Sequence, residues 1–309
     1  MTSARVLAGA LRLAAPAKLN LYLHVVGRRP DGYHLLDSLV AFATVGDDLT
    51  FSLASGLSLA IDGPFARGLD TGVDNLVLKA AHTLAAQAGR TVGAAIHLIK
   101  RLPVASGIGG GSADAAATLH GLNRLWNLGL PESALAEIGL GLGADVPVCL
   151  AGVPSFFGGI GDEIAAAAPL PRAHVVLVNP GAPLATAAVF RARTQAAAGP
   201  HLSQPARWTE AVPDTLSLTG LLAKRSNDLT AAAIGLLPAI ADVLAALELQ
   251  PPCLLARLSG SGATCFGLFA ECGEAREAAA AISAARPDWW VVATMLTGAR
   301  PEISVIPEV

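Results

Sequence analysis

The sequence of 309 residues is poor in charged and aromatic side chains. Charged residues make up 15% of the chain and aromatic residues 5%, and the formal net charge is -3. Binding to nucleic acid or to an anionic membrane surface depends on a surplus of Lys and Arg. The composition therefore gives no electrostatic case for either partner, while 53% hydrophobic residues are enough to bury a sizeable core.

Cysteine is scarce and shows no metal-binding spacing. None of the cysteines forms a C-x-x-C pair, and we expect all of them to be reduced and to serve in packing; they are Cys149, Cys253, Cys265 and Cys272. The sequence therefore gives no indication of a disulfide framework or a structural zinc site.

Long uninterrupted apolar runs are also missing. The longest stretch without Asp, Glu, Lys or Arg, residues 173–190, is broken by Pro180, Gly181 and Pro183. This pattern predicts a strand, a turn and a helix rather than a membrane span. Arg12 would fall inside the apolar core of any signal peptide, so we expect a cytoplasmic protein.

The chain does contain a dense glycine cluster, Pro103-Val-Ala-Ser-Gly-Ile-Gly-Gly-Gly-Ser112, which runs into an alanine-rich helical pattern. Glycine lets the backbone approach an anion, and the N–H groups at a helix start point toward it. The spacing is neither that of a P-loop nor that of a G-x-G-x-x-G dinucleotide turn. The cluster predicts a phosphate-binding loop, with a flexible loop without a ligand as the alternative.

Ser112 is the expected start of the helix after this cluster. Its hydroxyl could cap a backbone N–H group or reach a phosphate or a metal ion. Asp114 would then lie in the first turn, where a negative charge suits the helix dipole.

Elsewhere the hydrophobic pattern predicts mixed strands and helices without a repeat. Leucines and valine alternate with polar residues over 19–25, as in a half-buried strand that places Lys18 and Asn20 on one face. Turn residues at 28–32 then predict a hairpin with a basic tip and a returning strand at 33–43. Further helices are expected at 74–88, 112–127, 131–142, near 184, 228–247 and 273–285, and strands at 92–99, 174–178, 253–258, 263–269 and 289–294.

The glycines at 158–161 and the alanines at 165–168 are typical of a connection, so we place a domain boundary near residue 160.

Three motifs together resemble those of the GHMP small-molecule kinases. They are Pro16-Ala-Lys-Leu-Asn-Leu21, the glycine cluster, and Leu258-Ser-Gly-Ser-Gly-Ala-Thr264, in the order and approximate spacing of that family. Asp31-Gly-Tyr-His34 and Gly143-Ala-Asp-Val-Pro147 are similar to the branch of the family that acts on a cytidyl-linked isoprenoid precursor. The similarity extends from residue 14 to about 270 and is weak over 191–222.

The resemblance implies a two-domain α+β fold. An ATP-binding GHMP kinase domain like ribosomal protein S5 domain 2 would occupy residues 1–160, and a ferredoxin-like C-terminal domain residues 161–309. ATP and substrate would meet in the cleft between them. The implied reaction transfers the γ-phosphoryl group of ATP to the 2-hydroxyl of 4-diphosphocytidyl-2-C-methyl-D-erythritol, in the non-mevalonate isoprenoid pathway.

The same resemblance implies that Asp145 is the catalytic carboxylate and Lys18 its partner. Such a carboxylate can orient the acceptor hydroxyl and take its proton late, while the ammonium meets charge that develops on the phosphoryl group. Mg²⁺ is expected to arrive with ATP and at most to touch Ser112. The ATP-binding residues implied are Asp74, Asn75, Pro103, Val104, Ala105, Ser106, Gly107, Ile108, Gly109, Gly110, Gly111 and Ser112.

The cytosine of the substrate would lie among aromatic side chains. Tyr33 offers one stacking face and Phe190 a second, and His34 can form a hydrogen bond with the edge of the pyrimidine. Further contacts with the substrate are implied for Asn20, Thr186, Ser259, Gly260, Ser261 and Gly262.

Two residues depart from the usual loop of this family. Ala105 stands where an early glycine is common, and Ala113 where a second serine is common. The missing hydroxyl leaves Ser112 as the main side-chain candidate in the loop, with Ser106 as the residue that could compensate.

Two other functions stay open. A homoserine or mevalonate kinase would share the glycine loop but has no need of the Tyr33-His34 pair. A non-catalytic nucleotide-binding protein would tolerate the loss of Lys18 or Asp145, although both are present. The glycine spacing disfavours a nicotinamide oxidoreductase.

Overall fold

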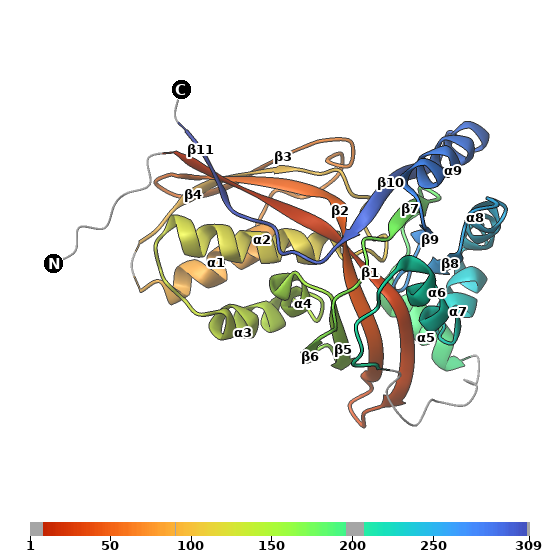
Figure 1. Ribbon diagram of the computed structural model, residues 1–309. Coiled ribbons are helices and arrows are strands. Elements are labelled where there is room, and N and C mark those ends of the chain that lie inside the picture. Colours follow the sequence, from red (N-terminus) through yellow and green to blue (C-terminus); the bar gives the residue numbers. More distant parts are fainter. Residues whose placement is uncertain (1–8, 90, 196–206, 308–309) are drawn as a thin grey trace.

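Two long antiparallel strands form the spine of the molecule. The computed structural model describes residues 9–89, 91–195 and 207–307. In it, β1 (Ala10–Arg28) pairs with β2 (His34–Leu53) along most of their length, through three register shifts. Figure 1 shows both strands running from the end where β11 (Ser304–Ile306) lies to a hairpin tip, with further elements on either side of them.

The described strands join into one 11-stranded sheet. Its main path runs β11, β1, β2, β10, β7, β9, β8, while β4 and β5 branch from β2 and carry β3 and β6. The remaining strands are β3 (Leu57–Asp62), β4 (Ala94–Ile99), β5 (Ser155–Gly159), β6 (Glu163–Ala166), β7 (His174–Asn179), β8 (Leu255–Leu258), β9 (Cys265–Phe269), β10 (Trp290–Thr297) and β11 (Ser304–Ile306).

The helices form two groups, one on each side of the spine (Figure 1). The first group comprises α1 (Leu76–Gln87), α2 (Gly110–Leu125), α3 (Glu132–Leu142) and α4 (Val146–Ala151). The second comprises α5 (Thr186–Gln195), α6 (Thr215–Ala223), α7 (Thr230–Leu236), α8 (Ala239–Glu248) and α9 (Cys272–Ala285). Separate hydrophobic clusters lie beneath the two groups, so each side of the spine has a core of its own.

The alanine-rich sequence of α2 is explained by how closely this helix packs on the sheet. Ala113, Ala115 and Ala116 are all buried in the first core. A Cβ at Gly121 would overlap the ring of Phe51 on β2, so only glycine permits this approach. Small side chains along one helix therefore fix the position of the loop that precedes it.

The start of α2 differs from the prediction. The helix begins at Gly110 rather than at Ser112, and its cap is Gly109, with a left-handed φ of 65°. Glycine adopts this conformation without the steric cost that a side chain carries, which explains why the glycine run continues into the helix. Ser112 is the third helical residue, and Asp114 lies beyond the first turn, where it was expected, and is buried.

Two other local predictions were wrong. The helix expected at 228–247 is two helices, α7 and α8, because Pro238 lacks the N–H group that a continuous helix needs. The segment 158–168, expected to be a connection, contributes to the β5–β6 hairpin. Residue 160 lies in the turn of this hairpin, and the placement of a domain boundary there stays a prediction.

The strand expected to be half-buried is buried on both faces. Asn20, Tyr22 and His24 are 1%, 0% and 4% exposed. The second group of elements covers this polar face: Arg257 on β8 donates to the carbonyl of Leu21, and residues 226–228 form backbone hydrogen bonds with Leu23. The alternating polar residues of this strand therefore face the second half of the chain and not water.

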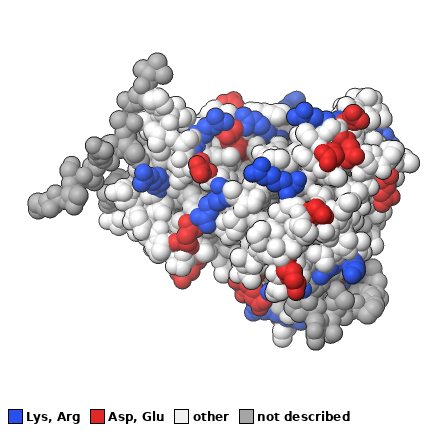
Figure 2. Space-filling model, in the orientation of Figure 1, with Lys and Arg blue, Asp and Glu red and all other residues white. Residues whose placement is uncertain are grey.

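The run of residues 173–190 forms β7, a turn and the first residues of α5, as predicted. Within the described ranges no helix is long and apolar enough to cross a membrane. Figure 2 shows acidic and basic groups interspersed among wide uncharged areas on one face.

A buried ion cluster lies beneath the start of α2. Lys100 Nζ donates to Asp47 Oδ2 at 2.6 Å and to Asp114 Oδ2 at 2.5 Å, and each of the three side chains is at most 5% exposed. Asp47 Oδ1 also accepts the N–H groups of Arg101 and Leu102. The cluster therefore ties β2, the chain after β4 and α2 together.

Burial dominates the protonation of this cluster. It raises the pKa of Asp114 to about 7, with the charge of Asp47 adding to the effect and that of Lys100 opposing it. Burial alone would lower the pKa of Lys100, but the two carboxylates raise it. With both carboxylates ionised the cluster would hold a net negative charge away from water, and proton binding by Asp114 removes that charge.

Asp114→Asn is expected to change how stability depends on pH. Because the folded protein binds the Asp114 proton more tightly than the unfolded chain, the wild type loses stability as pH rises from about 4 to about 7. The free energy of unfolding of the variant should therefore rise relative to the wild type across this window, by on the order of 1 kcal/mol per pKa unit, and level off above it. Urea denaturation at a series of pH values measures this difference. The exposed Asp242→Asn variant is the control, and a difference between Asp114→Asn and wild type that does not vary with pH would contradict the prediction.

Candidate active site

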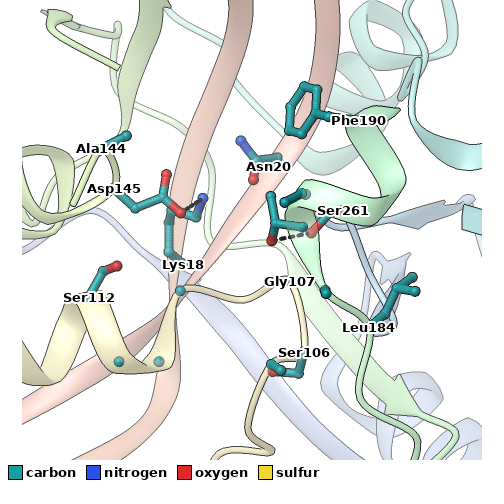
Figure 3. A pocket seen from close by; sticks show the side chains of 18 of the residues that line it. Lys18, Asn20, Ser106, Gly107, Ser112, Ala144, Asp145, Leu184, Phe190 and Ser261 are labelled. Carbon is teal, nitrogen blue, oxygen red and sulfur yellow. Dashed lines mark hydrogen bonds and ion pairs between the residues drawn. The ribbon is translucent and has the colours of Figure 1, made fainter. Parts of the chain in front are cut away.

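A cavity of about 1080 Å³ opens between the two groups of elements. Its wall comes from β1, the β1–β2 turn, the glycine loop 103–112, the start of α4, α5, and the loop between β8 and β9. Figure 3 shows Lys18 and Asp145 on one side of this space, with Ser112 on α2, Phe190 on α5 and Ser261 around it. All but four of the predicted site residues line the cavity, the exceptions being Asp74, Ile108, Ser259 and Gly262.

Three of those four residues lie outside the wall for different reasons. Asp74 is exposed and forms an ion pair with Lys79 at 3.1 Å, while its neighbour Asn75 lines the cavity and caps α1. Ile108 belongs to the hydrophobic core. Ser259 is fully buried behind the wall, as part of the backbone support described below.

Lys18 and Asp145 meet although they are far apart in the chain. Lys18 Nζ lies 2.9 Å from Asp145 Oδ2, with the lysine side chain 4% exposed and the aspartate side chain 36% exposed. The Lys18 stem runs along Gly109, where a Cβ would lie only 3.2 Å from that of the lysine. The ammonium is thus held in place by packing, while its carboxylate partner remains open to the cavity.

Asp145 owes its position to a turn at the start of α4. Val146 N donates to the carbonyl of Gly143 at 3.0 Å, and Pro147 occupies the first turn of the helix, where its missing N–H costs nothing. The motif recognised in the sequence at 143–147 therefore directs one carboxylate toward β1.

The glycine loop and the β8–β9 loop support each other through backbone contacts. Gly107 has a φ of 76°, and a Cβ there would lie 2.5 Å from the carbonyl oxygen of Ser259. Ser259 Oγ donates to the carbonyl of Gly107 at 3.1 Å and accepts the N–H of Asn20 at 3.2 Å. Thr264 N donates to the carbonyl of Ser106 at 2.9 Å. The glycine loop therefore has little freedom to shift.

The first turn of α2 faces the cavity. Gly110, Gly111 and Ser112 line it, and the N–H groups at a helix start have no partner within the helix. In Figure 3 the Ser112 hydroxyl points away from the helix into open space. Ser106, by contrast, directs its hydroxyl to the carbonyl of Pro103 at 2.5 Å. Backbone N–H groups and one hydroxyl are the anion-binding groups of this turn.

The two departures in the loop affect the site differently. Ala113 is 3% exposed, does not line the cavity and packs in the first core, so the absent hydroxyl would not have faced a ligand. Ala105 does line the cavity, and its φ of 50° is left-handed, which explains a preference for glycine at this position.

The amide of Asn20 has a defined orientation. Ser38 Oγ donates to the carbonyl of Tyr22 at 2.5 Å, so it accepts the hydrogen bond from Asn20 Nδ2, at 2.8 Å. Asn20 Oδ1 is buried and has no hydrogen-bond partner among the described residues. This oxygen can accept a hydrogen bond from a hydroxyl group that enters the cavity.

Aromatic residues gather at the end of the cavity near the hairpin tip. The ring centroids of His34 and Phe190 are 5.0 Å apart with an interplanar angle of 32°, and His34 Nε2 lies 3.1 Å from Thr194 Oγ1. Tyr33 lines the same region and is 63% exposed. Thr186 Oγ1 and Ser261 Oγ are 2.8 Å apart on the neighbouring wall. The structure thus brings the predicted base-reading residues to one place.

Sequence reasoning missed several residues of the wall. Lys100 and Asp114 line it from beneath the glycine loop, and Arg28 and Arg191 line it near the aromatic end. Lys100 directly follows an expected strand and comes just before the glycine cluster. This position could have indicated that its side chain lies near the loop. Nothing in the sequence placed Arg191 beside the hairpin, because that contact depends on the docking of α5.

Comparisons with known proteins agree with this geometry. The chain matches the GHMP kinases N terminal domain over residues 75–153 and the GHMP kinases C terminal domain over residues 212–288. It is 55% identical over 286 residues to the 4-diphosphocytidyl-2-C-methyl-D-erythritol kinase of Paramagnetospirillum magneticum, which covers 92% of this chain and 98% of that protein.

Solved structures show the same relation. A crystal structure of 4-(cytidine 5'-diphospho)-2C-methyl-D-erythritol kinase superposes with a TM-score of 0.74 at 33% identity, covering 93% of this chain and 100% of that one. Homoserine kinase from Cytophaga hutchinsonii superposes with a TM-score of 0.71 at 16% identity, over 98% of this chain and 100% of that one, which shows a shared fold alone. Given the high identity over nearly the whole chain, this protein belongs to the GHMP kinase family, among its 4-diphosphocytidyl-2-C-methyl-D-erythritol kinases.

Proposed function

We propose that this ATP-dependent kinase phosphorylates the 2-hydroxyl of 4-diphosphocytidyl-2-C-methyl-D-erythritol. The observation that carries the proposal is a single cavity in which the Lys18–Asp145 pair lies between the glycine loop and the aromatic end at His34 and Phe190. A phosphoryl donor and a base-containing acceptor can then meet at the carboxylate. The names of the relatives support this acceptor.

ATP binds with its phosphates on the glycine loop. The N–H groups at residues 110–112 supply hydrogen bonds, and the helix dipole favours the negative charge. Asn75 and the residues of the glycine loop before Gly107 line a separate part of the cavity wall. The adenosine of ATP lies against this part.

Asp145 receives the acceptor hydroxyl. A carboxylate is a far weaker base than an alkoxide, so Asp145 orients the hydroxyl and accepts its proton late, as the loose transition state of phosphoryl transfer allows. Lys18, which is nearly buried, holds its ammonium beside the reacting groups and stabilises negative charge on the phosphoryl group in transit. Asn20 Oδ1 accepts a hydrogen bond from a hydroxyl of the acceptor.

Mg²⁺ would arrive with ATP. No group of three or more His, Cys, Asp or Glu side chains in the described segments is placed to hold a cation by itself, so phosphate oxygens and water would supply most ligands. The Ser112 hydroxyl is the side chain that would hold the ion, which would neutralise charge on the phosphates.

Asp145→Asn tests the chemistry. The amide cannot accept the proton, so kcat is expected to fall by about 10²- to 10⁴-fold with a small change in the KM of ATP. ADP release with Mg·ATP measures this, using the cytidyl acceptor, methylerythritol phosphate, homoserine and mevalonate in turn.

Asp242→Asn is the matched control on an exposed helix face. Turnover of homoserine or mevalonate instead of the cytidyl compound would refute the acceptor, and an Asp145→Asn variant with near-normal kcat would refute the role of the carboxylate.

Phe190→Ala tests the base site. Loss of a stacking face is expected to raise the KM of the cytidyl acceptor about 10-fold, corresponding to roughly 1–3 kcal/mol of base stacking. The KM of ATP should stay the same, and Phe190→Tyr should restore most of the affinity. Equal increases in both KM values would mean that the substitution disturbs the cavity as a whole.

Metal dependence has its own test. Chelation with EDTA is expected to abolish turnover and added Mg²⁺ to restore it, whereas calorimetry should detect Mg²⁺ binding only when a nucleotide is present. Ser112→Ala should raise the Mg²⁺ concentration needed for half-maximal activity. Tight binding of Mg²⁺ to the protein alone would show that a protein site exists.

A further inference from the structure

The charged side chains of the cavity wall are not all paired. Each carboxylate of the wall already has a cationic partner: Asp31 with Arg29 at 2.8 Å, Asp114 with Lys100 at 2.5 Å, and Asp145 with Lys18 at 2.9 Å. Four Lys and Arg side chains line the wall, and two of them, Lys18 and Lys100, are used in these pairs. The remaining two are Arg28 and Arg191.

Neither of these arginines forms an ion pair with a carboxylate of the described segments. Residues 196–206, which follow α5, contain no Asp or Glu in their sequence. The wall therefore presents two positive charges that are not balanced by a neighbouring carboxylate of these segments.

Both arginines lie at the aromatic end of the cavity. Arg28 is directly opposite His34 in the β1–β2 ladder, and opposite residues of an antiparallel pair project to the same face. The ring of His34 contacts that of Phe190, and Arg191 follows Phe190 on α5. The Arg28 guanidinium is held over the turn because its Nε donates to the carbonyl of Gly32 at 3.1 Å, which leaves its Nη groups available.

We propose that Arg28 and Arg191 form the subsite that binds the diphosphate of the acceptor. This inference rests on the proposed function, because it assumes an acceptor in which a diphosphate links the cytidine to the part that is phosphorylated. A guanidinium presents a planar set of donors that matches phosphate oxygens, and its charge persists at all working pH values. Lys18 lies at the reacting groups and Lys100 beneath the glycine loop, and each is already paired with a carboxylate.

The placement also suits the connectivity of such an acceptor. The diphosphate is attached to the nucleoside, so it must leave the base site within a few bonds of the aromatic residues. Arg28 from the hairpin and Arg191 from α5 line the cavity beside these aromatic residues, within reach of a group attached to the nucleoside. The subsite thus gives selectivity for a nucleoside diphosphate over a neutral nucleoside.

Calorimetry with cytidine and with cytidine 5'-diphosphate tests the subsite. The full-length protein is first saturated with Mg²⁺ and a non-hydrolysable ATP analogue, so that the second nucleotide cannot occupy the ATP site. The wild type should bind the diphosphate more tightly than cytidine. Arg28→Gln and Arg191→Gln should each weaken binding of the diphosphate roughly 10-fold or more, while binding of cytidine stays unchanged.

Arg276→Gln is the matched control, because Arg276 is exposed on α9 and does not line the cavity. In steady-state assays, the two subsite variants should raise the KM of the acceptor and leave kcat and the KM of ATP nearly unchanged. Arg191→Lys should recover part of the loss, since it keeps the charge.

The outcomes separate this inference from the proposed function. If the wild type binds the diphosphate and phosphorylates the acceptor, but Arg28→Gln and Arg191→Gln both behave like Arg276→Gln, the subsite is refuted and the function stands. An equal loss of cytidine and diphosphate binding would also refute the subsite, because it would indicate damage to the base site. If the wild type neither binds the diphosphate nor phosphorylates the acceptor, both inferences fail.

Discussion

The contact between two glycine-containing loops is the constraint on which the rest of the site depends. At Gly107 and Ser259 the backbones are too close for a side chain on the glycine, and Ser259 joins both to β1 through Asn20. Buried backbone groups must find partners, and here each loop supplies them for the other. The two halves of the chain are therefore fixed relative to each other along the cavity wall, and Lys18, Asn20 and the start of α2 acquire their positions from this contact.

The cavity wall combines paired and unpaired charges in a way that suits a reaction between two anions. Buried charges are stable only when they are paired, and this condition holds for Lys100 and for Lys18. In the proposed site, the glycine loop binds phosphate through backbone N–H groups, which carry no formal charge. Side-chain cations without a carboxylate partner occur only toward the hairpin tip among the described wall residues. In the proposed arrangement, this distribution of binding groups would keep two polyanionic ligands apart except at the reacting atoms.

The sequence was sufficient for the motifs and for most elements, because these depend on local periodicity and on glycine geometry. Lys18 and Asp145 could be paired only through resemblance, since nothing local links two residues 127 positions apart. Burial was harder to foresee: the polar face of β1 is covered by β8 and the chain before α7, a contact with no local signal. Likewise, the helix start was misplaced at Ser112, because a glycine with left-handed φ can cap a helix without a side-chain hydrogen bond. Predictions failed where tertiary contacts override local preference.

The two unusual alanines of the glycine loop show which features of the loop matter for binding an anion. Ala113 replaces a hydroxyl at a position inside the core, so its substitution removes no group from the cavity. Ala105 adopts a left-handed φ at a cost on the order of 1 kcal/mol, while its carbonyl accepts the N–H of Leu184 at 3.2 Å and so helps to hold the approach to α5. Neither change alters the N–H groups of residues 110–112. The proposed phosphate binding would therefore depend on the path of the backbone, and that path is maintained by the ion cluster beneath α2 and by the glycines that allow close packing.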